Sequence, residues 1–282
     1  MGEFSLINRH FRGPRLRSDV VLGIGDDCAL VIPDHSQAMA ISVDTLIEGV
    51  HFLPSADPKC LGHKALAVNL SDLAACGAIP TWCTLAISHP NPEDDWLSAF
   101  MGGFFDLASR HLIELIGGDT TKGPLSITVQ VMGAVPQEQA LRRSTASPGD
   151  LIYVSGPIGN AGLGLLSALG KTPIHHPDLI QALNEPIPRV ELGIQLRELA
   201  SSCIDISDGL AADLGHILHD SQVGATVYWE QIPFSDAVRE HIRTTGNRSF
   251  PLCCGDDYEL CFTTPPERQH EVDRILSLIH IS

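Results

Sequence analysis

The stretch "LSITVQVM" (residues 125–132) is the feature that most limits the possible folds, because apolar residues recur at every second position along it. A period of two puts Leu125, Ile127, Val129 and Val131 on one face of a β-strand. Other β-rich runs lie at 20–24, 38–43, 81–87, 151–154, 225–229 and 259–263. The sequence therefore predicts a sheet with at least one apolar face.

Helical patterns separate these runs, so the sequence predicts a mixed α/β or α+β architecture. A polar, turn-rich passage, "RRSTASPGD" (residues 142–150), is the best candidate for a domain boundary. We therefore expect two domains, residues 1–140 and 141–282, because the length is sufficient for two ordinary cores. The predicted helices lie at 60–76, 93–115, 161–169, 188–200, 209–220 and 266–276.

The charge of the chain limits the kinds of partner that it can bind. The chain has 18 Lys and Arg and 34 Asp and Glu, which gives a formal net charge of −16. This excess argues against binding driven by nucleic-acid phosphates or by anionic membranes. The sequence has no run of 18 uncharged apolar residues, and its start, "MGEFSLINRHF", does not resemble a signal peptide. The eight cysteines form no CxxC pair, so we expect a cytoplasmic protein with reduced, buried thiols.

Seven aspartates stand in short motifs that favour metal binding. Most of them adjoin Gly, Ser or Thr, and such small neighbours let the backbone approach a ligand closely. Carboxylates and hydroxyls are hard oxygen donors suited to Mg²⁺, which a chain this acidic would need in order to bind phosphates. The motifs are "GIGDDCAL", "SVDT", "NLSDLAACGA", "IGGDTT" and "DISDGL", and the aspartates are Asp26, Asp27, Asp44, Asp72, Asp119, Asp205 and Asp208.

Each aspartate also has a purely structural interpretation. Asp208 could cap the helix that follows it, and Asp119 could end a turn after the glycine pair. Asp26 and Asp27 could form an Asx turn. Asp72 weakens this interpretation for the whole set, because an unpaired carboxylate inside an apolar helical face is costly.

Nucleotide-binding motifs of other kinds are missing from the sequence. It contains no GxxxxGK[ST], and "SGPIGNAGLGLL" (residues 155–166) lacks both the GxGxxG spacing and a basic residue. This loop could present amides to an anion at the start of the helix near Ala161. It could equally be a tight turn.

Taken in order, the motifs resemble those of the thiamine-monophosphate kinase family from Gly2 to about Thr264. Several are shared with aminoimidazole ribonucleotide synthetases, selenophosphate synthetases and hydrogenase-maturation proteins. "DTLIEGVHF", which contains His51, is typical of the thiamine branch, together with "GGDTT" and "DYELCF". The matching segments are "GIGDDCAL", "SVDTLIEGVHF", "LGHKALAVNLSDLAACGAIP", "IGGDTTKGPLSITVQVMG", "DISDGLAADLGHI" and "GDDYELCFT".

The resemblance implies phosphoryl transfer from ATP to thiamine monophosphate by a homodimer with several Mg²⁺ ions. It implies a synthetase-like fold with an N-terminal ATP- and Mg²⁺-binding domain, which forms a dimeric barrel with its partner, and a C-terminal α/β domain. Carried over by motif, the magnesium ligands would be Asp27, Ser42, Asp44, Asp72, Asp119, Asp205 and Asp208. ATP would meet Gly118, Asp119, Arg143 and Ser207, and thiamine monophosphate would meet His51 and Asp256.

The sequence departs from the family pattern at three places. Val43 stands where a Thr is usual, and Cys254-Gly255-Asp256 stands where Gly-Gly-Glu is usual. The last seven residues, "LSLIHIS", match what a common sequencing-library transposon end would encode, so we expect the native chain to continue beyond Leu276. Family members continue for a few dozen residues and supply an aromatic residue that packs on the thiamine moiety.

Two other interpretations stay open. The first is a superfamily relative that acts on another phosphate acceptor. Selenophosphate synthetases carry a reactive Cys or selenocysteine ahead of the first metal motif, and this chain has no Cys before Cys28. Hydrogenase-maturation relatives end in a functional Cys, whereas this sequence ends in Ser282. The second is a nucleotide-binding protein without turnover, which would bind ATP and Mg²⁺ but release no ADP in response to thiamine monophosphate.

Overall fold

The structure, a computed structural model, describes residues 6–279. The start of the family resemblance at Gly2 and the last three residues of "LSLIHIS" lie outside the described residues. The chain divides into two compact units. The first holds the described residues up to Leu73 and Ile79–Gln137, and the second holds Ala74–Ala78 and the described residues from Glu138 onward.

A four-stranded sheet with the order β3-β6-β4-β5 forms the first unit. β6 pairs antiparallel with β3 and β4, and β5 runs parallel to β4. Ile127, Val129 and Val131 have no exposed surface, which confirms the buried face predicted from the alternation. The strands are β3 (Gln37–Ile47), β4 (Ile79–His89), β5 (Glu114–Lys122) and β6 (Ser126–Pro136).

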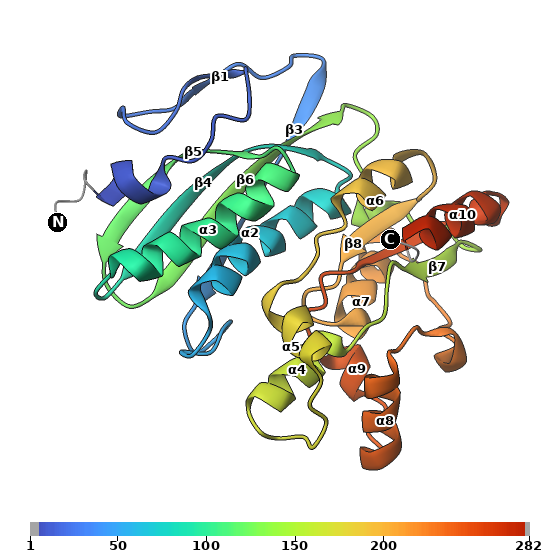
Figure 1. Cartoon of the computed structure of the whole chain (residues 1–282). Coiled ribbons are helices and arrows are strands. Elements are labelled where there is room, and N and C mark those ends of the chain that lie inside the picture. Colours follow the sequence, from blue (N-terminus) through green and yellow to red (C-terminus); the bar gives the residue numbers. More distant parts are fainter. Residues whose placement is uncertain (1–5, 280–282) are drawn as a thin grey trace. The chain divides into compact units, whose positions relative to one another are not determined.

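Two helices, α2 (Pro58–Ala75) and α3 (Asp94–Arg110), cover one face of this sheet (Figure 1). Their backbones approach closely through two glycines. A Cβ on Gly62 would lie 1.9 Å from the Phe100 carbonyl oxygen, and a Cβ on Gly103 would lie 1.9 Å from that of Lys59. Helices packed this closely form a rigid support for the strands beneath them.

A small hairpin of β1 (Val20–Leu22) and β2 (Leu30–Val31) packs on the opposite face. Val20 forms a buried cluster with Trp82 and Ile116, and Met132 packs against it. Met132 alternates with the inward-facing Val131, so this cluster lies on the face away from the helices. Much of the remaining face is exposed.

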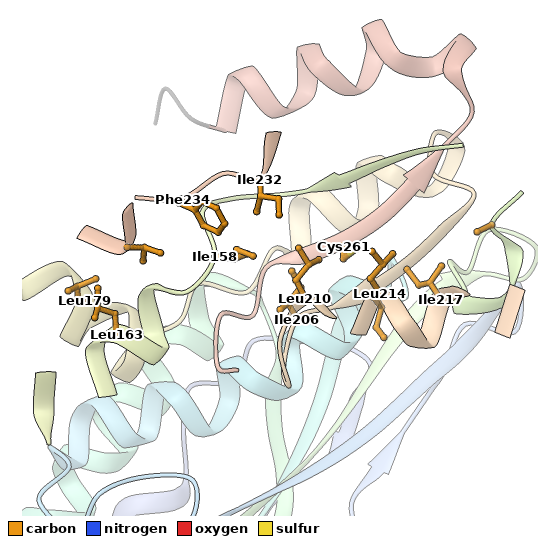
Figure 2. Close-up of a cluster of buried hydrophobic side chains, with 13 residues drawn as sticks. Ile158, Leu163, Leu179, Ile206, Leu210, Leu214, Ile217, Ile232, Phe234 and Cys261 are labelled. Atoms are coloured by element: carbon orange, nitrogen blue, oxygen red, sulfur yellow. The ribbon is translucent and has the colours of Figure 1, made fainter. Parts of the chain in front are cut away.

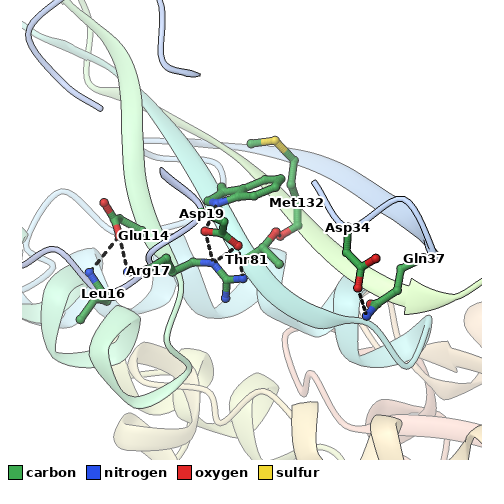
Figure 3. A network of polar contacts seen from close by, with 9 residues as sticks. Leu16, Arg17, Asp19, Asp34, Gln37, Thr81, Glu114 and Met132 are labelled. Carbon is green, nitrogen blue, oxygen red and sulfur yellow. Dashed lines mark hydrogen bonds and ion pairs between the residues drawn. The ribbon is translucent and has the colours of Figure 1, made fainter. Parts of the chain in front are cut away.

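Polar contacts attach the segment before the hairpin to the sheet (Figure 3). Arg17 forms an ion pair with Asp19, whose Oδ1 accepts the indole N–H of Trp82 at 3.1 Å. Glu114, at the start of β5, accepts the backbone N–H groups of Leu16 and Arg17 at 2.8 and 2.7 Å. A π-helical turn, η1 (Ile7–Phe11), precedes this segment.

The second unit is built on a three-stranded antiparallel sheet with the order β7-β9-β8. Its core includes Ile158, Ile206, Leu214, Phe234 and Cys261, each at most 8% exposed (Figure 2). The strands are β7 (Leu151–Val154), β8 (Ser202–Asp205) and β9 (Leu260–Thr264). The helices are α4 (Asn160–Ala168), α5 (Pro177–Asn184), α6 (Val190–Gln195), α7 (Leu210–Ser221), α8 (Asp236–Thr245), α9 (Phe250–Cys253) and α10 (Gln269–Ile279), with short turns η2 (Arg143–Thr145), η3 (Leu196–Glu198), η4 (Trp229–Gln231) and η5 (Pro266–Arg268).

These elements confirm the predicted mixed α/β class. Both larger sheets are open, and within residues 6–279 no barrel closes on itself. The barrel that the resemblance implies, formed with a partner subunit, stays a prediction.

Several predicted elements were wrong. The helix predicted at 93–115 ends at Arg110, because Leu112 adopts φ 51 and Glu114 already begins β5. The run 225–229 is not a strand, and the helix predicted at 188–200 shortens to α6 followed by the turn η3. Sequence reasoning missed β8, whose four residues are all buried and so show no alternation, and also α5 and α8.

All eight cysteines are free thiols, but the expectation that they are buried was wrong for most of them. Cys83, Cys203 and Cys261 are buried, whereas Cys28 and Cys253 are exposed. Between residues 6 and 279, no helix is both long enough and apolar enough to span a bilayer.

Candidate functional site

A cavity of about 410 Å³ in the first unit brings together the motifs "GIGDDCAL" and "IGGDTT". Asp26, Asp27 and Asp119 line it. Asp26 accepts the backbone N–H of Asp27 through Oδ1 at 2.8 Å, so its carboxylate shapes the loop. This volume lies in the range of small-molecule sites in proteins.

Gly118 explains why the glycine pair precedes Asp119. A Cβ at Gly118 would lie 1.8 Å from the Leu85 carbonyl oxygen, and its φ of +154° is unfavourable for other residues. The absence of a side chain therefore lets β5 pass close to β4. The interpretation of Asp119 as the end of a turn was wrong, because β5 continues through it to Lys122.

A second cluster joins β3 to α2. The Ser42 hydroxyl donates a hydrogen bond to Asp72 Oδ2 at 2.5 Å, and the Asp44 N–H donates to Asn69 Oδ1 at 3.0 Å. Burial raises the pKa of Asp44, the charge of Asp72 raises it further, and His51 acts in the opposite direction. Ser42 and Asp44 from the motif "SVDT" and Asp72 from the motif "NLSDLAACGA" thus form one cluster of oxygen donors.

Val43 points away from this cluster. Ser42 and Asp44 alternate to the helix-covered face of β3, whereas Val43 lies on the opposite face and is 54% exposed. The departure at this position therefore removes no side-chain oxygen from the Ser42–Asp44–Asp72 cluster. His51 is exposed, and its Nδ1 accepts the backbone N–H of Ile47 at 3.1 Å.

In the second unit, the motifs "DISDGL" and "GDDYEL" are held against each other by backbone hydrogen bonds. Asp256 N donates to Ser207 O at 2.9 Å, and Tyr258 N donates to Ile206 O at 2.8 Å. A Cβ on Gly255 would lie 2.2 Å from the Ser207 carbonyl oxygen, so glycine is required at this crossing. Together these contacts bring the loop that carries Asp256 against the loop that carries Ser207.

The predicted metal ligands in this pair of loops differ in exposure. Asp205 is 4% exposed at the end of β8, whereas Asp208 is exposed in the following turn. The interpretation of Asp208 as a helix cap was wrong, because Asp213 has that role. Asp213 Oδ2 accepts the N–H groups of Ser207, Asp208 and Gly209 at 3.0–3.1 Å.

Sequence reasoning missed Asp213 as well as Asp257. An aspartate in the first turn of a helix after a glycine is a capping signal that could have identified Asp213. Asp257 accepts the Gly159 N–H at 2.8 Å, and burial raises its pKa to about 7. The loop 155–166 therefore presents a backbone amide at the start of α4 to the carboxyl group of Asp257.

The loop between α9 and β9 has a constrained backbone. Asp256 and Tyr258 have φ of 69° and 50°, and the Tyr258 hydroxyl donates to Asp256 Oδ1 at 3.1 Å. Glu259 fixes the far end of the loop through two hydrogen bonds from Arg189, at 2.8 and 2.5 Å. Such outliers persist only where the surroundings enforce them, and they concentrate at functional sites.

The remaining predicted residues divide between the units. Gly118 and Asp119 belong to the first unit, whereas Arg143 and Ser207 belong to the second, and both of these are exposed. Asp27, Ser42, Asp44, Asp72 and Asp119 lie in the first unit, and Asp205 and Asp208 in the second.

The donor set suits magnesium in its chemistry. Within residues 6–279, no three His, Cys, Asp or Glu side chains gather closely enough to enclose a metal ion. Mg²⁺, however, usually keeps several waters and binds through one or two carboxylates plus substrate phosphates. The carboxylate pairs and the Ser42 hydroxyl match that mode of binding.

Comparison with known proteins identifies the family. The model of the AIR synthase related protein N-terminal domain matches residues 25–135, and that of the C-terminal domain matches residues 147–278. Thiamine-monophosphate kinase of Escherichia coli (strain K12) is 48% identical over 277 residues, covering 96% of this chain and 85% of that protein.

Two solved structures agree with this assignment. The crystal structure of thiamine-monophosphate kinase from Stenotrophomonas maltophilia K279a superposes with a TM-score of 0.89 at 44% identity, over 99% of this chain and 91% of that one. "AaThiL complexed with AMPPCP and TMP" gives 0.78 at 31% identity, over 84% and 78%. By sequence and by structure, this chain belongs to the thiamine-monophosphate kinase family.

Proposed function

We propose that this protein transfers the terminal phosphoryl group of ATP to thiamine monophosphate, giving thiamine diphosphate and ADP, the last step of thiamine diphosphate biosynthesis. The observation that carries the proposal is 48% identity to the Escherichia coli kinase over 96% of the chain. A related structure, 31% identical, is a complex with AMPPCP and TMP.

The chemistry of the reaction agrees with an acidic site. The acceptor is already an ionised phosphate, so no strong general base is needed, and the main obstacle is repulsion between two phosphate anions. Each pair of unit charges at about 4 Å costs about 4 kcal/mol at an effective dielectric of about 20. Positioning and charge neutralisation are therefore what the protein must provide.

In this proposal, magnesium is held by Asp27, Ser42, Asp44, Asp72 and Asp119 of the first unit and by Asp205 and Asp208 of the second. Bound magnesium would supply positive charge shared between phosphate oxygens. The raised pKa of Asp44 supports this role, because a buried carboxylate beside Asp72 is stabilised by a cation. The catalytic set contains no other residue.

The substrates have their own proposed contacts. ATP meets Gly118, Asp119, Arg143 and Ser207, and thiamine monophosphate meets His51 and Asp256. Support comes from the exposed backbone at Gly118 and from the hydrogen bond that fixes Asp256 in its strained loop. The shorter side chain of Asp256, compared with the usual Glu, keeps the carboxylate.

We propose that the enzyme is a homodimer, with residues 1–140 as the nucleotide, magnesium and dimerisation domain and 141–282 as the C-terminal domain. The outer face of β3 supports this, because Met39, Ile41, Val43 and Ile47 are each 40–59% exposed. These four residues, the β3 apolar stripe, lie on one edge strand of an open sheet. Such a stripe is typical of an interface between subunits.

A cytoplasmic location belongs to the same proposal. Cys28 and Cys253 are exposed and unpaired, as expected of thiols in a reducing compartment.

The test is a panel of phosphate acceptors offered with ATP and Mg²⁺, with ADP release as the measured quantity. We expect release with thiamine monophosphate and none with unphosphorylated thiamine or with aminoimidazole ribonucleotide precursors. ADP release with a different acceptor would indicate that the protein belongs functionally to another branch of the superfamily. ATP binding without release from any acceptor would indicate a binding protein without turnover.

A further inference from the structure

The cavity that contains Asp27 and Asp119 also contains a positive charge that the motifs do not include. Its wall is completed by the N-terminal segment through Ile7, Phe11 and Arg12. Arg12 is the one basic side chain among the described residues that line this cavity. Its guanidinium therefore faces a space otherwise bordered by carboxylates, glycines and apolar groups.

Gly25 makes room for this guanidinium. A Cβ on Gly25 would lie 2.3 Å from the terminal nitrogen Nη2 of Arg12, so any other residue would displace the arginine. Gly25 also has φ +126°, a conformation that other residues rarely adopt. The loop thus brings the guanidinium against the backbone that leads into Asp26 and Asp27.

Arg12 differs from its neighbouring arginines in having no protein partner among residues 6–279. Arg9 pairs with Asp94 at 2.5 Å, Arg15 donates to the Val20 carbonyl, and Arg17 pairs with Asp19. Arg12 forms no ion pair with the described carboxylates, although Asp26 and Asp27 line the same cavity. Three arginines anchor the segment, and the fourth is left facing the cavity.

We propose that Arg12 binds the polyphosphate of ATP in this cavity. A guanidinium carries fixed charge and a planar set of donors that match phosphate oxygens, and the phosphates would supply the negative partner that the protein does not. This inference rests on the proposed function, because Gly118 and Asp119, the proposed ATP contacts, line the same cavity. The inference about Arg12 thus gives the N-terminal segment a role in nucleotide binding.

The experiment compares Arg12→Ala and Arg12→Lys with the matched control Arg15→Ala, which lies on the same segment but outside the cavity. Equilibrium binding of ATP, ADP, AMP and adenosine is measured by competition without thiamine monophosphate. Loss of a charge-assisted contact weakens ATP binding by about 10- to 100-fold in Arg12→Ala. Adenosine binding stays unchanged, Arg12→Lys recovers part of the loss, and Arg15→Ala binds ATP like the wild type.

Two results would overturn the proposal. One is ATP binding by Arg12→Ala equal to that of the wild type. The other is an equal loss for ATP and adenosine, because that pattern indicates a general disturbance of the cavity rather than a phosphate contact. Circular dichroism melting of each variant verifies that the fold is retained.

The same variants separate this inference from the proposed function. If the wild type binds ATP but does not phosphorylate thiamine monophosphate, the proposed function fails while the binding data still decide the role of Arg12. If the wild type is an active kinase and Arg12→Ala leaves the KM for ATP unchanged, the role of Arg12 fails while the proposed function stands.

Discussion

Ser42 and Asp72, thirty positions apart in the sequence, are joined by a hydrogen bond of 2.5 Å from the Ser42 hydroxyl to the Asp72 carboxylate. This contact connects β3 to α2 and places Asp72 close enough to Asp44 to raise the pKa of Asp44. Two carboxylates that repel each other in a partly buried position reduce stability unless a cation is bound. The proposed magnesium-binding role of this cluster therefore predicts a cost in metal-free stability.

Asp44→Asn is predicted to separate activity from stability. The variant loses a proposed magnesium ligand, so kcat falls by about 100- to 1,000-fold, the usual cost of removing one charge-stabilising group from a phosphoryl-transfer site. The fold is retained with equal or greater stability without Mg²⁺, because burial and the repulsion by Asp72 are relieved. Wild-type turnover, or a clear loss of metal-free stability, would contradict this account.

Gly255→Ala is predicted to disturb the contact between the "DISDGL" and "GDDYEL" loops. The new Cβ would lie 2.2 Å from the Ser207 carbonyl oxygen, and overpacking of this kind costs about 1–3 kcal/mol. Urea denaturation measures the loss, and the KM for thiamine monophosphate should rise with it. Gly215→Ala is the matched control: a Cβ there meets no atom within 4 Å, so this change in α7 should stabilise by about 0.5–1 kcal/mol.

Asp257 is predicted to make stability depend on pH. Its pKa rises from 3.8 to about 7 on folding, so between these values the unfolded chain has released the proton that the folded chain retains. The free energy of unfolding therefore falls as pH rises through this window, by up to about 4 kcal/mol at about 1.4 kcal/mol per unit.

Asp257→Asn lacks this titration and keeps an oxygen that accepts the Gly159 N–H. We predict that the variant gains stability relative to the wild type between pH 4 and pH 8, measured by urea denaturation at each pH. Glu138→Gln, at an exposed turn residue, provides the comparison and should give a flat difference. A flat difference for Asp257→Asn as well would show that this carboxyl titrates alike in both states.

Ile41→Asp is predicted to convert the dimer to a monomer. Ile41 is 59% exposed at the centre of the β3 apolar stripe, so a charge there opposes burial against a second subunit without disturbing the core. Light scattering after gel filtration should give about twice the chain mass of 30.3 kDa for the wild type and the single mass for the variant. Ile187→Asp, at a residue that is 65% exposed in the second unit, should stay dimeric. A monomeric wild type would refute the proposed interface.

The sequence was most informative where side chains follow a local rule. Alternation predicted the buried face of β6, and the residue types beside Asp44, Asp72 and Asp119 indicated where the structure gathers oxygen donors. The same rule explains Val43: its side chain alternates to the outer face, so the change from Thr is less severe for the cluster than the motif alone suggested.

The features that the sequence did not predict depend on contacts between residues far apart in the chain. Asp257 caps a helix 98 positions away, and neither residue alone carries a signal of that pairing. β5 was not predicted, because the pair Gly117-Gly118 breaks the strand pattern, although Gly118 is required by the close approach of β4. Asp213 was detectable in principle, because a carboxylate in the first turn of a helix is a local capping signal.

The central claim, that this chain is a thiamine-monophosphate kinase with Asp119 at its reacting site, is tested most directly by chromatographic measurement of thiamine diphosphate. The reaction contains ATP, Mg²⁺ and thiamine monophosphate, with wild type and Asp119→Asn in parallel. We predict one thiamine diphosphate for each ADP with the wild type and a loss of at least about 100-fold with the folded variant. ADP formed without thiamine diphosphate, or equal turnover by the two proteins, would contradict the account.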